Sequence, residues 1–131
     1  MPFPSSTSGN EGRLRAPASP PMIRLPLSGV LNMASAPEVL RRVHRAVASA
    51  PRGTCVVLDL DDVVLLAAAG LTTLVAARQF GRAVGVPVRF VCTQPRLVKL
   101  IRQCGLEDEL PVHHDAPTAV RGLPPAPRSP Q

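Results

Sequence analysis

The stretch "LDLDDVVLLAAAGLTTLVAA", residues 58–77, decides the fold, because it predicts a strand that passes through a loop into a helix. Loops after the carboxyl ends of strands are the usual place for ligands and partners in α/β sheets. Three alanines, Ala67, Ala68 and Ala69, stand in this loop where polar residues would carry a function. Their methyl groups either fill a core or mark a site whose polar chemistry has been removed.

Strand and helix patterns alternate before this stretch. Residues 22–31 alternate apolar and polar side chains, which predicts a strand, and Pro26 within it favours an edge position because proline has no amide donor. Residues 35–49 have helical periodicity, and Ser35 with Glu38 forms the pattern of a capping box at the start. The apolar run 54–60 is typical of a central strand that is covered on both faces.

The alternation continues towards the end of the chain. We expect a loop over 61–70, a helix over 70–85, a strand over 86–92 and a helix over 94–105 with Gly105 at its end. A short strand at 109–112 and a helical turn at 116–121 follow. Strands and helices in this order predict parallel strands joined by helical crossovers, and hence an α/β layer fold.

The chain has 131 residues, and its two ends differ in composition from its middle. Residues 1–21 are rich in proline and serine and residues 122–131 in proline, so both are predicted to be disordered tails. A single domain is therefore expected over 22–121. Neither a signal peptide nor a membrane-spanning run is recognised, so we expect a cytoplasmic protein without membrane insertion.

The formal net charge of +6 is spread over helices, a strand and both tails, and the chain has no Tyr or Trp for base stacking. This distribution predicts solvated helix faces and no nucleic-acid partner. The three cysteines, Cys55, Cys92 and Cys104, are odd in number and far apart, which favours buried free thiols.

Motifs of enzymes are missing from the sequence, which holds no phosphate-binding loop and no nucleophile elbow. The adjacent carboxylates of Asp61 and Asp62 are expected to help form a turn, and His44 is expected to lie on a helix surface. The run His113, His114 and Asp115 lacks the spacing of metal ligands. We therefore predict no enzyme, no cofactor and no metal.

Three segments taken in order resemble the STAS domain family, the anti-sigma factor antagonists. They are "LSGVLNMASAPEVLRRV" (27–43), "VVLDLDDVVLLAAAGLTTLVAA" (56–77) and "VPVRFVCTQPRLVKLIRQCGLEDELPV" (86–112). The resemblance covers about residues 22–121 and implies a small mixed, mostly parallel sheet of four to five strands backed by three to four helices. Its best-known members are bacterial regulators of sigma factors.

Members of this family bind an anti-sigma factor that is also a serine kinase, which phosphorylates a serine in an Asp-Ser-Ser/Thr-Gly loop. Here the matching places are Ala67, Ala68 and Ala69, followed by Gly70 and Leu71. An alanine methyl group has no oxygen to accept a phosphoryl group, so the family's switch cannot operate at Ala68. In the family, the turn after the first strand commonly ends in Asp. The matching residue in this chain is Asn32.

The resemblance predicts a non-enzymatic module that docks a kinase-type anti-sigma factor through residues 67–75. Thr72 and Thr73 are expected to cap the helix start or to lie exposed, with a displaced phosphate acceptor at Thr72, Thr73 or Ser35 left open. Leu71, Val75 and Arg78 or Arg82 form a stripe at helical spacing opposite the expected core face. The candidate partner-binding residues are Asn32, Ala67, Ala68, Ala69, Gly70, Leu71, Thr72, Val75 and Arg78.

Two other functions stay open. Some STAS-like proteins are accessory subunits that dock on the ATPase of an ABC lipid-transport complex. An enzyme or nucleotide-binding protein is the third possibility, which the missing phosphate loop disfavours. A homodimer is also left open.

Overall fold

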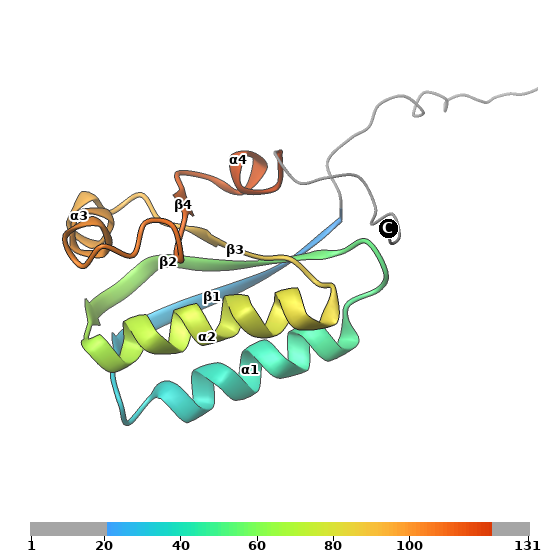
Figure 1. The fold of residues 1–131 in the computed structure, drawn as a ribbon, viewed down its shortest axis with the longest axis horizontal. Coiled ribbons are helices and arrows are strands. Elements are labelled where there is room, and N and C mark those ends of the chain that lie inside the picture. Colours follow the sequence, from blue (N-terminus) through green and yellow to red (C-terminus); the bar gives the residue numbers. More distant parts are fainter. Residues whose placement is uncertain (1–20, 122–131) are drawn as a thin grey trace, which may run out of the picture.

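Strands and helices alternate through the whole of residues 21–121, which are the residues that the computed structural model describes (Figure 1). The strands are β1 (Met22–Leu31), β2 (Cys55–Leu66), β3 (Val88–Val91) and β4 (Val112–His113). The helices are α1 (Ala36–Ser49), α2 (Ala68–Val84), α3 (Pro95–Gln103) and α4 (Ala116–Arg121). Apart from Pro21, the tails predicted for 1–21 and 122–131 lie outside the described residues.

The four strands form one sheet in the order β1-β2-β3-β4, and every neighbouring pair is parallel. This sheet with its helices confirms the predicted α/β fold class. β1 lies at an edge, as Pro26 predicted, and β2 lies inside the sheet between β1 and β3. The parallel order follows from the helix that separates each strand from the next.

Helices cover the two faces of the sheet unequally. α1 and α2 lie side by side against one face, and α4 lies on the other (Figure 1). The main core lies on the α1 and α2 side and includes Leu27, Val43, Leu58, Leu74 and Phe90. A smaller core on the α4 side consists of Cys55, Val57, Val91, Ala119 and Val120.

β2 is longer than predicted, because the expected loop over 61–70 is mostly strand. β2 continues to Leu66, and α2 begins at Ala68 after the single residue Ala67. The register with β1 shifts twice. Pro26 pairs with Asp59 but Ser28 pairs with Asp62, so β2 has one extra residue there, and Val64 is a second extra residue between the pairs Gly29–Val63 and Val30–Leu65. Such β-bulges bend a strand and change the direction of its side chains, which lets a strand continue where the alternation of the sequence breaks.

Three local predictions were wrong. Ser35 makes no side-chain cap on α1; its hydroxyl donates to the Val30 carbonyl at 2.8 Å and accepts from the Asn32 amide at 3.0 Å. Cys104, expected on the buried side of its helix, is exposed because it follows the last residue of α3. The last strand lies at 112–113 instead of 109–112.

Candidate functional site

The corner between β2 and α2 is built on the end of β1. The Ala67 amide donates to the Leu31 carbonyl at 2.9 Å, and Ala67 keeps an extended conformation with φ −83° and ψ 172°. Ala68 is exposed, while Ala67 and Ala69 are half-buried. The three methyl groups are therefore not sealed in the core, and Ala68 presents a neutral surface at the start of α2.

Two of the predicted contact residues have structural roles instead. Gly70 is buried, and a Cβ atom there would lie 2.4 Å from the Leu31 carbonyl oxygen, so glycine is needed for α2 to pack on β1. Leu71 is only 6% exposed and belongs to the main core. The expected outward stripe that starts at Leu71 is therefore wrong.

The remaining stripe residues are only partly accessible. Val75 is half-buried and packs against the main core. Arg78 is also half-buried, and its Nη1 donates to the Glu109 carbonyl at 3.3 Å, so it holds the connection after α3. Arg82 is exposed near the end of α2.

The two threonines of α2 do not cap its free amides, in contrast to one of the predicted roles. The Thr72 hydroxyl donates to the Ala68 carbonyl at 3.1 Å, and the Thr73 hydroxyl donates to the Ala69 carbonyl at 2.7 Å. Both bonds run back one turn, as is common for hydroxyls within helices. Thr72 is exposed, whereas Thr73 is buried, so only Thr72 offers an accessible hydroxyl here.

Asn32 organises the turn between β1 and α1. Its Oδ1 accepts from the Ala34 amide at 2.9 Å and from the Ser35 amide at 3.1 Å. An aspartate could accept the same two bonds, so the change from the family's common residue removes a charge and keeps the turn.

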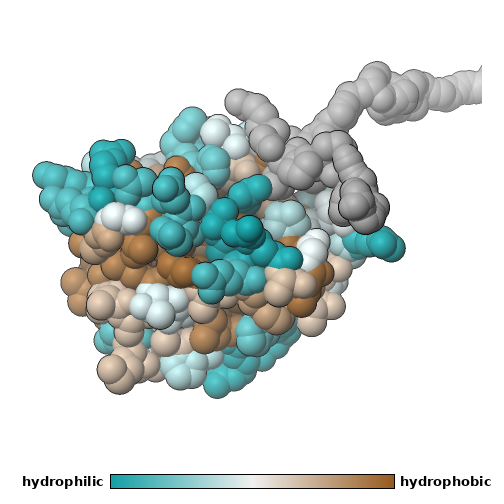
Figure 2. All heavy atoms as spheres, viewed as in Figure 1, coloured by the Kyte–Doolittle hydropathy of each residue, from teal (hydrophilic) through white to brown (hydrophobic). Residues whose placement is uncertain are grey.

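Four large apolar side chains are exposed at the carboxyl ends of β1 and β2, and we call them the end patch. They are Val30 at 41%, Met33 at 80%, Val64 at 64% and Leu65 at 52% exposure. Val30 and Leu65 are register partners on neighbouring strands. In Figure 2 apolar atoms gather on the left of the view, where Figure 1 places the end of β2 and the start of α2. Exposed apolar side chains that gather at one end of a sheet are typical of interaction sites.

Sequence reasoning missed the end patch. Val64 and Leu65 belong to the run "VVLLAAAGL", whose continuous apolarity gives no indication of which residues face outwards. The bulge at Val64 determines which of these residues face outwards: Val63 and Leu66 are buried, and both residues between them are exposed.

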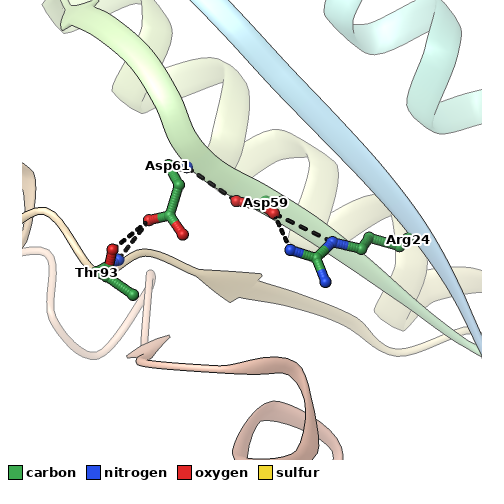
Figure 3. Close-up of polar contacts among 4 residues, drawn as sticks. All are labelled: Arg24, Asp59, Asp61 and Thr93. Carbon is green, nitrogen blue, oxygen red and sulfur yellow. Dashed lines mark hydrogen bonds and ion pairs between the residues drawn. The ribbon is translucent and has the colours of Figure 1, made fainter.

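A chain of polar contacts lies on β2 before the end patch (Figure 3). The Arg24 guanidinium makes an ion pair with Asp59, which is 8% exposed, and the Asp59 Oδ1 also accepts from the Asp61 amide at 2.9 Å. Asp61 in turn accepts from the Thr93 amide and from the Thr93 hydroxyl at 3.0 Å. The predicted turn role of Asp61 is thus wrong, since its carboxylate ties β2 to the segment that follows β3.

Gln94 satisfies the backbone of β2 where β3 has ended. Its Nε2 donates to the Asp61 carbonyl at 2.7 Å and to the Val63 carbonyl at 2.9 Å, and it lies 3.3 Å from the Leu60 carbonyl. The ladder between β2 and β3 stops at Asp59 and Val91, so these carbonyls have no strand partner on that side. One side chain therefore supports the part of β2 that leads to the end patch.

Two of the three thiols, Cys55 and Cys92, are buried, whereas Cys104 is exposed. Burial raises the pKa of Cys55 to about 11 and also raises that of Cys92. Burial and the charge of Arg89 lower the pKa of His113, which is half-buried, while His114 is exposed. Within residues 21–121 no group of three His, Cys, Asp or Glu side chains is placed to hold a metal ion, and no helix there is long and apolar enough to cross a membrane.

The fold and this corner define a class of protein. The family model of the STAS domain matches residues 13–119, and the chain therefore belongs to the STAS domain family. The match begins within the segment that was expected to be a tail.

Among solved structures, the chain is similar to an anti-sigma factor antagonist from Mycobacterium paratuberculosis, with 27% identity and a TM-score of 0.63. The similarity covers 76% of this chain and 86% of that one. The comparison with curated proteins gives no match. Family and structure together support a regulatory binding module that resembles an anti-sigma factor antagonist.

Proposed function

We propose that this protein docks a serine-kinase-type anti-sigma factor through the end patch and the start of α2, without being phosphorylated at the family position. The contact set keeps Asn32, Ala67, Ala68, Ala69 and Thr72 from the sequence prediction. Val75 and Arg78 remain at its margin, because both are half-buried. Gly70 and Leu71 support this surface from beneath and are left out of it.

The observation that carries the proposal is the exposed apolar surface beside an exposed alanine. Val64 and Leu65 are more than half exposed just before the corner, and Ala68 is exposed just after it. Burying such side chains against a partner contributes about 25 cal/mol per Å² of apolar surface. A soluble domain gains nothing from keeping them in water, which favours a partner at this end of the sheet.

The absence of a hydroxyl at residue 68 makes docking permanent in this proposal. In a switching antagonist the added phosphate brings about −1.5 to −2 charges, which a close-packed apolar interface cannot desolvate easily. Ala68 cannot acquire that charge, so phosphorylation at this position never releases the partner. The protein would then act as an antagonist that is always available, controlled by its amount.

The test is calorimetric titration of the full chain with each serine-kinase-type anti-sigma factor encoded in the same genome. We expect one of them to bind, and Ala68→Asp to weaken that binding by about 100-fold or more, because an unpaired carboxylate would be buried in the interface. Ala48→Asp is the matched control, since Ala48 is an exposed alanine on α1.

Four results would contradict the proposal. Binding to none of these kinases, or equal affinity of Ala68→Asp and wild type, would remove the docking surface from this corner. Binding to the ATPase subunit of an ABC transporter in place of a kinase would support the alternative function. Phosphate found on Thr72 in protein recovered from cells would show that the surface is switched after all.

A further inference from the structure

The sheet face opposite α1 and α2 is open next to the end patch. Register pairs between β1 and β2 alternate between the two faces, and the pairs Gly29–Val63 and Leu31–Leu66 face the main core. The pairs that alternate with these two, Ser28–Asp62 and Val30–Leu65, therefore face the opposite side, and all four of their residues are exposed. The end patch thus continues along this face into a polar pair.

α4 covers a different part of the same face. Ala119 and Val120 pack on Cys55, Val57 and Val91, near the beginning of β2 and at the end of β3. Near the carboxyl end of β2 no described element lies over the pairs of Ser28 and Val30. The result is a half-open face that is apolar at the pair Val30–Leu65 and acidic two register pairs earlier, at Asp62.

Three carboxylates lie on this part of β2, and two of them are engaged. Asp59 is held by Arg24, and Asp61 is held by Thr93. Asp62 is exposed, and no donor among residues 21–121 makes a hydrogen bond or ion pair to its carboxylate. It is therefore the carboxylate on this face that is available to a partner.

We infer that Asp62 selects the partner, and that the partner places a lysine or arginine on Asp62 next to apolar side chains that cover Val30 and Leu65. This inference rests on the proposed docking surface and adds the chemistry of what docks there. A carboxylate at the margin of an apolar contact disfavours acidic and neutral segments, which would leave it desolvated and unpaired. A basic group in the same place forms an ion pair that also speeds the encounter.

The net charge of the chain allows a specific contact at Asp62 to be distinguished from unspecific charge attraction. The whole chain carries a formal charge of +6, so unspecific attraction would enrich acidic partners. A preference for basic segments can arise only from a local acidic surface. The connection after α3, which holds Glu107, Asp108 and Glu109, is the competing acidic surface and supplies the control.

The experiment uses a phage-displayed library of random peptides, so that its result does not depend on whether the partner is a kinase. The full chain is the bait, and bound peptides are compared for wild type, Asp62→Lys, Asp62→Asn and the control Asp108→Lys. We expect enriched peptides with a lysine or arginine beside leucine, valine or phenylalanine. Their affinity should fall about tenfold or more for Asp62→Lys, fall less for Asp62→Asn, and stay unchanged for Asp108→Lys.

Chemical-shift mapping of one enriched peptide on labelled protein locates the site, with shifts expected at Val30, Asp62 and Leu65. Acidic or uncharged consensus peptides, equal binding to Asp62→Lys, shifts elsewhere, or no enrichment at all would each overturn the inference. A kinase that binds in the calorimetric test with the same affinity for Asp62→Lys would overturn it while the proposed function stands. Basic peptides at this face without any binding kinase would keep the inference and reject that function.

Discussion

At the scale of single residues, the positions that the family resemblance highlighted divide into two kinds. Ala68 and Thr72 are exposed and can touch a partner, whereas Gly70 and Leu71 are buried beneath them. The pair Gly70 and Leu71, which follows the position that matches the family's phosphorylated serine, therefore serves packing in this chain. The resemblance identifies the place of the corner in the sequence but not the direction of each side chain.

Gly70 offers a test of this division. Gly70→Ala should lower the free energy of unfolding by about 1–3 kcal/mol, because the new Cβ would lie 2.4 Å from the Leu31 carbonyl oxygen and 2.9 Å from the Leu66 Cδ1. Urea denaturation followed by circular dichroism measures the change. Thr72→Ala, two residues further along α2 at an exposed position, should stay within about 0.5 kcal/mol of wild type. Equal stability of Gly70→Ala and wild type would show that α2 does not need this close approach.

At the scale of elements, β2 is the decisive strand because it changes its neighbours along its length. Its first half pairs with both β1 and β3, and its second half pairs with β1 alone. Two bulges in that second half turn Asp62, Val64 and Leu65 outwards. The free edge of β1 is itself unsuited to further pairing, since Pro26 lacks an amide and Arg42 binds its carbonyl at 2.9 Å.

We expect the stability of the second half of β2 to depend on the Gln94 side chain. Gln94→Leu leaves the Asp61 and Val63 carbonyls without their side-chain donor, and we expect a loss of about 1–2 kcal/mol in unfolding free energy. Amide hydrogen exchange should also speed up from Asp61 to Leu66 more than in α1. The matched control is Gln79→Leu, because Gln79 is an exposed glutamine on α2. Identical exchange in the Gln94 variant would mean that the bulged half of β2 holds its shape without this side chain.

At the scale of the whole molecule, the sheet separates a large core from a small one. Seven leucine and phenylalanine side chains with almost no exposure, among them Leu58, Leu74 and Phe90, lie in the main core, whereas α4 adds only Ala119 and Val120 to the other. A six-residue helix held by so few contacts is expected to open before the rest of the molecule unfolds.

Thiol labelling can follow this opening. At pH 8 iodoacetamide should modify the exposed Cys104 first, and Cys55 slowly, because it is buried beneath α4 and its pKa is raised to about 11, which keeps the unreactive thiol form. Val120→Ala should speed labelling of Cys55 several-fold, as read by mass spectrometry. Cys92, which belongs to the main core, is the internal control and should keep its rate. Equal acceleration of both thiols would indicate global unfolding in place of local opening of α4.

The sequence by itself determined the order of the elements, the parallel sheet, the edge position of β1 and the absence of a side-chain hydroxyl at Ala68. Apolar periodicity and the chemistry of side chains are local properties, so they can be read residue by residue. Only the tertiary structure decided that Leu71 is buried and that Val64 and Leu65 are exposed. It also decided that Asp59 and Asp61 are engaged, while no donor within residues 21–121 binds the Asp62 carboxylate. These facts depend on bulges in β2 and on where β3 and α4 end, which are set by contacts between segments far apart in the chain.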